Sequence, residues 1–102
     1  MKKYNLYVGL NDKDTKTQKI DTVEAFKIAS NIVVKMFGAG TIYTADGIYT
    51  HENDEIVIEK TLNIEILTDD SEKIKDIINI LKLTFNQESI LKQTQTIEYD
   101  FI

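Results

Sequence analysis

Four segments of the chain alternate apolar and polar residues in the way that is typical of β-strands. The clearest is residues 56–67, where isoleucine and leucine hold most of one set of alternate positions and polar residues hold most of the other. Residues 4–10 alternate in the same way, residues 41–50 are rich in Thr, Ile and Tyr, and residues 89–101 form a more polar last segment. Because one face of these segments is polar, the pattern predicts a sheet that is covered on one side only.

Two further segments place apolar residues at helical spacing. The first covers residues 22–37, where Asp21 is a suitable N-cap and Gly38 a suitable C-terminal residue. The second follows the capping sequence at residues 69–71 and is closed by residues 86–87. Its apolar stripe consists of Ile74, Ile77, Ile78, Leu81 and Phe85.

The order strand, helix, strand, strand, helix, strand predicts one α+β domain over residues 1–102. This order is that of the ferredoxin-like β-α-β-β-α-β fold, an antiparallel sheet with two helices on one face. The residues expected to pack between helices and sheet are Phe26, Ala29, Val33, Ile74, Ile77, Ile78 and Leu81, against Leu6, Val8, Leu62, Ile64 and Ile66. Asp46-Gly47 interrupts its segment and fits either a two-residue hairpin turn or a bulge.

Three short motifs recur in this order along the chain: LYVGL at residues 6–10, EKTL at residues 59–62 and FNQESIL at residues 85–91. With them the chain resembles an uncharacterised bacterial family of small domains whose members read L-Y-F-G-L, then E-x-S-x-x-L, then F-x-Q-x-S-V-L. Val8 stands where that family has an aromatic residue. The resemblance implies a shared fold and no particular activity.

Charge and missing residue types narrow the functions that remain. Acidic residues outnumber basic ones by 17 to 12, the net charge is −5, and all the bases are lysine. Because nucleic-acid binding depends on basic patches, we expect no direct contact with nucleic acid. The absence of cysteine and the single histidine, His51, remove the common metal and nucleophile motifs, so we expect no cofactor and no metal.

The chain also has no segment that would place it in a membrane. No apolar run approaches the ~18 residues of a membrane span, and the first residues lead into mixed sequence rather than an apolar signal core. We therefore expect a cytoplasmic protein without a membrane partner.

The candidate functional residues lie mainly on the open face of the predicted sheet. Glu59, Thr61 and Asn63 alternate along one strand, Tyr7 on the neighbouring strand points the same way, and Thr61 is placed to orient Glu59. A rigid polar face of this kind suits a ligand or a partner, although it equally suits solvent.

Gln87 and Ser89 follow the second helix and complete the predicted ligand or partner surface. Side chains at such a position also commonly satisfy backbone groups at a helix end. No catalytic role is assigned to either, because a serine nucleophile needs a general base and only the distant His51 is available.

We interpret the chain as a non-enzymatic binding or interaction module that captures a small ligand or a protein on the open face and forms a homo-oligomer. One alternative is an acidic inhibitor or decoy, encoded by a mobile element, that acts on a nucleic-acid-binding defence enzyme of the host. Another is a small-molecule enzyme that uses Glu59 or Tyr7. The absence of a catalytic constellation favours a protein that is not an enzyme.

Overall fold

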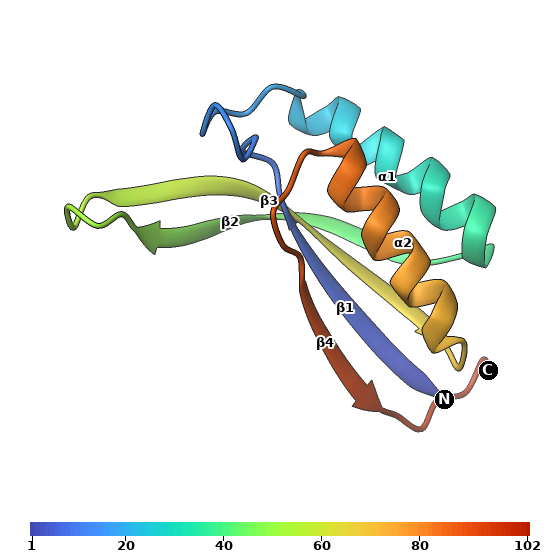
Figure 1. The fold of residues 1–102 in the computed structure, drawn as a ribbon. Helices are drawn as coiled ribbons and strands as arrows, with labels where there is room; N and C mark the ends of the chain where they lie inside the picture. Colours follow the sequence, from blue (N-terminus) through green and yellow to red (C-terminus); the bar gives the residue numbers. More distant parts are fainter.

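The computed structural model describes residues 1–102 as a four-stranded sheet with both helices on one face (Figure 1). In chain order the elements are β1 (Lys2–Gly9), α1 (Thr22–Phe37), β2 (Thr41–Thr50), β3 (Ile56–Thr68), α2 (Ser71–Thr84) and β4 (Leu91–Thr96). The strand order is β2-β3-β1-β4, and all neighbouring strands are antiparallel. The predicted ferredoxin-like α+β fold is therefore confirmed. Neither helix is long and apolar enough to cross a membrane.

The helix ends follow the local chemistry of the sequence. A side-chain oxygen of Asp21 accepts the backbone N–H of Val23 at 3.1 Å, and Gly38 ends α1 in the left-handed conformation with φ of 80°. Asp70 caps α2 by accepting the N–H of Lys73 at 2.9 Å. These contacts satisfy N–H groups that lack partners within the helix.

The core forms between the helices and the central strands β1 and β3. Leu6 lies opposite Ile64 and Val8 opposite Leu62, and all four side chains are fully buried. The helices bury Ala25, Ala29, Val33, Ile74, Ile77 and Leu81 against them. The strand register predicted from the sequence is correct.

Phe26 was expected in this core, but this expectation is wrong, because the residue is 37% exposed. The buried stripe of α1 follows Ala25, Ala29 and Val33, which are spaced four residues apart. Phe26 lies about 100° further round the helix. Ile78, also expected there, is only partly buried and packs at the edge of the core.

Two expectations about the strands are corrected. Asp46-Gly47 is neither a turn nor a bulge, because β2 continues through it with Asp46 opposite Lys60 and Gly47 opposite Glu59. The chain turns instead at residues 51–55, between the two strands. The last strand spans only Leu91–Thr96, so residues 97–101 lie outside it.

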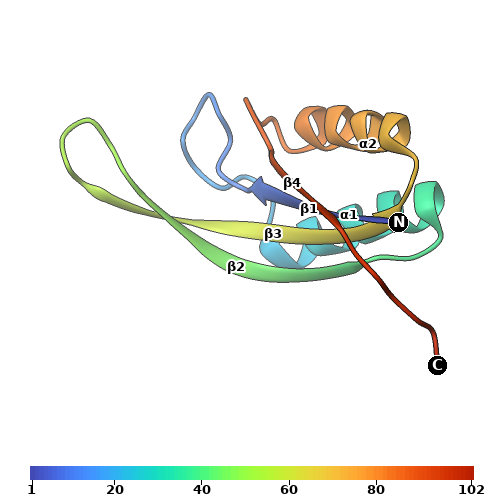
Figure 2. The same cartoon turned by 90° about the horizontal axis from the view of Figure 1, so that it is seen from below.

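The hairpin of β2 and β3 extends well beyond the rest of the sheet (Figures 1 and 2). β1 ends at Gly9, opposite Thr61, so residues 46–60 form a two-stranded ribbon that we call the arm. Ile56 and Ile58 continue the apolar face of β3, but on the arm they have no helix above them and are 71% and 64% exposed. Ile48, directly opposite Ile58, is exposed as well.

The loop between β1 and α1 is fastened to the loop between α2 and β4. The side-chain amide of Asn86 donates to Oδ2 of Asp12 at 2.9 Å, and the backbone N–H of Lys13 donates to the carbonyl of Asn86 at 3.0 Å. Oδ1 of Asp12 accepts the backbone N–H groups of Asp14 and Thr15. These hydrogen bonds, that from Asn86 first, lower the pKa of Asp12 from 3.8 to about 2.

We expect Ile64→Ala to lower the free energy of unfolding by about 2–5 kcal/mol. Ile64 is fully buried between Leu6 on β1 and Ile42 on β2, so truncation leaves a cavity in the middle of the sheet. Denaturant titration of both proteins measures the difference. Leu83→Ala is the control, because that side chain is 84% exposed and its loss should change stability by no more than about 0.5 kcal/mol. Equal losses in the two variants would contradict the core assignment.

The Asp12 contacts predict an acid-sensitive contribution to stability. Because the folded-state pKa lies below the ordinary value of 3.8, this contribution is present above about pH 4 and is lost as the pH falls through about 2. Asp12→Asn should therefore be less stable than the wild type at neutral pH, and the gap should close between about pH 4 and pH 2. Thermal unfolding across this range measures it, with the exposed Asp76→Asn as control. A gap that is independent of pH would disprove the role of the Asp12 charge.

Candidate functional site

The face of the sheet opposite the helices carries the odd-numbered residues of β1, β2 and β3. Tyr7 on β1 and Tyr43 on β2 both lie beside Asn63 on β3. One step further along the sheet, Gly9 lies opposite Thr61, and beyond the end of β1 Gly47 lies opposite Glu59. Small residues thus occupy the open face where the arm begins.

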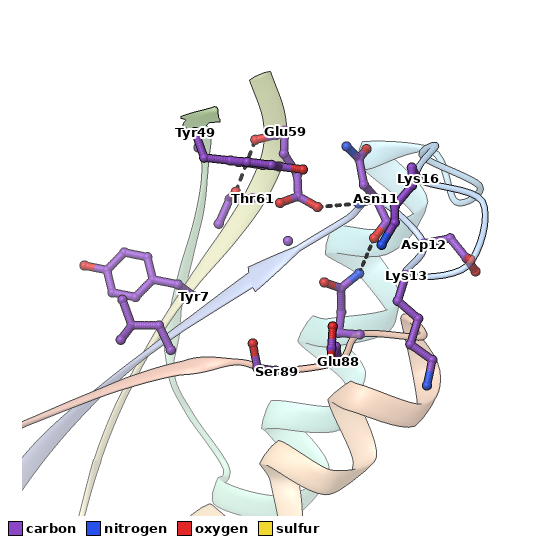
Figure 3. A pocket seen from close by; sticks show the side chains of 14 residues that line it. Tyr7, Asn11, Asp12, Lys13, Lys16, Tyr49, Glu59, Thr61, Glu88 and Ser89 are labelled. Carbon is purple, nitrogen blue, oxygen red and sulfur yellow. Dashed lines mark hydrogen bonds between the residues drawn. The ribbon is translucent and has the colours of Figure 1, made fainter. Parts of the chain in front are cut away.

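A pocket of about 550 Å³ lies at this place (Figure 3). Its sheet side is formed by Tyr7 and Gly9 of β1, Leu91 of β4, and Gly47, Tyr49, Glu59 and Thr61 of β2 and β3. Its other side is formed by the two fastened loops, with Asn11, Asp12, Lys13, Lys16, Gln87, Glu88 and Ser89. The fold therefore brings together one rigid wall and two loops that are held to each other.

Glu59 is the acid best placed to meet a ligand in this pocket. Its Oε2 accepts the backbone N–H of Asn11 at 2.8 Å, whereas no donor of the chain binds its Oε1. The carboxylate lies directly on the backbone of Gly9, where an added Cβ would be only 2.6 Å from Cδ and from Oε1. Because glycine has no side chain, the Glu59 carboxylate can lie against the backbone at position 9.

Thr61 does not orient the carboxylate of Glu59 as expected. Its hydroxyl donates instead to the backbone carbonyl of Glu59 at 3.2 Å. The same hydroxyl oxygen would be 3.0 Å from a Cβ at Gly47. Gly9 and Gly47 thus leave room on either side of β3 for the Glu59 carboxylate and the Thr61 hydroxyl, so no larger side chain rises from this part of the pocket.

Two tyrosines supply the aromatic surface of the pocket. Tyr7 is half-buried, and its hydroxyl donates to Oε1 of Gln93 on β4 at 3.3 Å. Tyr49 comes from the arm and packs edge-on against His51, with ring centroids 5.8 Å apart. Figure 3 shows both tyrosines across the pocket from the β1–α1 loop.

Of the other residues expected at the site, Gln87 and Ser89 line the pocket and Asn63 does not. The Gln87 amide donates to the backbone carbonyls of Asn11 at 2.7 Å and Phe85 at 3.2 Å, so it fastens the loops together. Ser89 is exposed and makes no hydrogen bond with the chain. Asn63 is buried one row away, where its amide donates to the hydroxyl of Tyr43 at 2.6 Å.

Several lining residues were missed by the sequence reasoning. Asn11, Lys13, Lys16 and Glu88 belong to loops, which have no periodic pattern to reveal them. Gly47 did carry a signal, because a glycine within a strand often marks a close approach to the backbone. No three acidic or histidine side chains converge on a point that would hold a metal ion.

Solved structures with the same fold were found by structural comparison. A phage SAM lyase in complex with S-methyl-5'-thioadenosine matches with a TM-score of 0.64 and 24% identity, over 92% of this chain and 79% of that one. The phage SAM lyase in the apo state matches with a TM-score of 0.69 and 23% identity, over 92% and 78%. At these identities the likeness shows the fold alone.

The divalent ion tolerance protein CutA1 from Ehrlichia chaffeensis also shares the fold. Its TM-score is 0.57 at 14% identity, over 97% of this chain and 84% of that one. No curated protein matches the chain.

Membership of a family is shown over almost the whole sequence. The model of the family described as "Protein of unknown function (DUF3574)" matches residues 3–101. An uncharacterised family of small domains was expected from the three sequence motifs, and this expectation is confirmed. The chain belongs to the DUF3574 family.

Proposed function

We propose that this protein binds a purine nucleoside carrying a sulfur substituent, a thioether or a sulfonium, in the pocket around Glu59. The observation that carries the proposal is the carboxylate of Glu59, which is fixed by the Asn11 N–H through one oxygen and offers the other to the pocket. A fixed acceptor of this kind binds sugar hydroxyl or amino groups without first having to be ordered.

The shape of the pocket supports a flat ligand. Its volume of about 550 Å³ falls within the range of ~300–1,000 Å³ that is usual for small-molecule sites. Gly9 and Gly47 add no side chains to the sheet side of the pocket, and Tyr7 and Tyr49 add aromatic surface. An aromatic ring can pack on such surfaces, while its polar edge reaches the carboxylate and Ser89.

The structural comparison supports the chemical class of the ligand. S-methyl-5'-thioadenosine, bound in the similar phage SAM lyase, is a purine nucleoside thioether. The shared fold extends over 92% of this chain.

A second candidate function is turnover of SAM in the same pocket. It is favoured by the activity of the similar structures and by the free oxygen of Glu59, because a carboxylate can accept the proton that leaves carbon in an elimination while the C–S bond breaks and the neutral thioether departs. Against it, the hydrogen bond to the Glu59 carboxylate comes from the backbone N–H of Asn11, and no second side chain binds this carboxylate to activate it as a base. Incubation with SAM followed by chromatography separates the two: unchanged SAM supports binding alone, and a loss of SAM that Glu59→Gln prevents supports an enzyme.

We expect S-methyl-5'-thioadenosine to bind and Glu59→Gln to weaken its binding by about ten- to a hundredfold, as for the loss of a hydrogen bond to a charged group. Isothermal titration calorimetry measures both affinities. Gly9→Ala should reproduce the loss, because the new Cβ displaces the carboxylate. Adding Glu59→Asp to Gly9→Ala should restore part of the affinity, since the shorter side chain draws back from position 9.

Glu98→Gln is the matched control, because Glu98 is exposed and outside the pocket. It should leave the affinity unchanged. If the wild type does not bind S-methyl-5'-thioadenosine, or if Glu59→Gln binds it as well as the wild type does, the proposal is wrong.

That the chain forms a homo-oligomer stays a prediction. Besides the open face of the sheet, the arm is a second surface through which copies of the chain could associate. Ile48, Ile56 and Ile58 form an exposed apolar set on a ribbon that is too thin to bury them. We expect the chain to sediment as an oligomer and the double change Ile48→Lys with Ile58→Lys to release monomers. Leu83→Lys, at another exposed apolar position, should not. Sedimentation of the wild type as an 11.7 kDa monomer would rule the oligomer out.

The acidic decoy also stays a prediction. Capture of a basic nucleic-acid-binding protein from a host lysate, released by salt, would support it in place of the ligand site.

A further inference from the structure

We infer that Lys16, together with Lys13, forms an anion-recognition subsite at the mouth of the pocket, so that the ligand carries a carboxylate or a phosphate group. The inference rests on the proposed function and adds a group of the ligand beyond the nucleoside. It assigns a binding role to the loop between β1 and α1, beyond the contacts that a nucleoside alone would need.

Lys13 and Lys16 are the lysines that line this pocket. Neither has a carboxylate within 4.0 Å, since the ion pairs of the chain use Lys3, Lys60 and Lys75 and the N-terminus. Figure 3 shows both on the loop side, across the pocket from Tyr7 and Tyr49. Neither ammonium group is therefore held by an acid of the chain, although the Lys13 side chain in Figure 3 extends away from the sheet and must turn to reach the pocket.

The loop holds these lysines in a defined place. The N–H of Asp12 donates to the carbonyl of Thr17, and the N–H of Lys16 donates to the carbonyl of Asp12, both at 2.8 Å. The N–H of Lys13 reaches the carbonyl of Asn86 on the other loop. A subsite carried on such a loop loses less entropy on binding than one on a free segment.

Lys16 also has an unusual backbone conformation. Its φ is 60°, in the left-handed region that a glycine adopts at lower cost than a lysine. The turn would therefore close at least as well with glycine at this position. What lysine contributes here is a long cationic side chain.

The other charges of the pocket leave the lysines as the groups that attract an anion. Asp12 is occupied by Asn86 and by backbone N–H groups, and the carboxylate of Glu59 lies at the floor on Gly9. Glu88 is the remaining acid on the rim, and it would meet an ammonium group if the anion belongs to an α-amino acid. In a chain with a net charge of −5, and with three acids and two lysines among the lining residues, an anionic group is accepted only where it meets these lysines directly.

Three probes with the same adenosine moiety test the inference by calorimetry at low salt. S-methyl-5'-thioadenosine has no anionic group, S-adenosylhomocysteine carries a carboxylate, and adenosine monophosphate carries a phosphate. We expect at least one anionic probe to bind about tenfold tighter than the neutral one, with the gap closing towards about 0.5 M salt. The tighter of the two identifies the kind of anion.

Lys16→Gly should remove this preference without affecting binding of the neutral probe, and its melting temperature should equal or exceed that of the wild type. Lys13→Ala should reduce the preference, and Lys27→Ala on α1, an exposed lysine away from the pocket, should not. Neutral-probe binding with no preference for either anion overturns the subsite and leaves the proposed function standing. Equal weakening of all three probes by Lys16→Gly would show that the lysine is structural. Binding of none of the probes overturns both proposals.

Discussion

The antiparallel ladder between β1 and β3 is the interaction on which the rest of the structure depends. Its facing pairs, Leu6 with Ile64 and Val8 with Leu62, are sealed from water by the small and aliphatic side chains of the two helices. Alanines at positions 25 and 29 let α1 approach the sheet closely. Because the even-numbered residues of β1 and β3 are committed to this core, their odd-numbered residues must face the open side. The place of Tyr7, Glu59 and Thr61 is thus a by-product of how the core is packed.

The difference in length between the same two strands creates the pocket. β1 stops at Gly9, while β3 begins five residues before its partner at position 61. After β1 the N–H of Leu10 still donates to the carbonyl of Lys60, and the next N–H, that of Asn11, meets the carboxylate of Glu59. Had β1 continued, its side chains would have covered the arm and filled the space that is now open.

The sequence was sufficient for the fold and for part of the site because period-two alternation determines the face of a strand residue. It placed Ile64 inside and Tyr7, Glu59 and Thr61 outside, and the helical spacing found Ala29 and Val33. It failed at Phe26, since a helical stripe can be rotated by one residue without changing its apolar content. Alternation also shows which face a residue takes but not whether anything covers that face, as the exposed Ile58 illustrates. The loop residues of the pocket depend on the contact between Asp12 and Asn86, 74 positions apart, for which no local pattern exists.

The thinness of the arm has a thermodynamic consequence for the pocket at its base. Tyr49 belongs to a ribbon with no third layer, whereas Glu59 is tied to the loop by the Asn11 N–H, so a change in the twist of the ribbon would move Tyr49 relative to the loops. A molecule that grips the isoleucines further out selects among these twists and thereby changes the affinity of the pocket. Linkage makes the relation reciprocal: whatever fills the pocket changes, by the same free energy, how strongly the arm is held. Binding at the isoleucines of the arm and binding in the pocket would then each change the affinity of the other site, although the two sites share no residue.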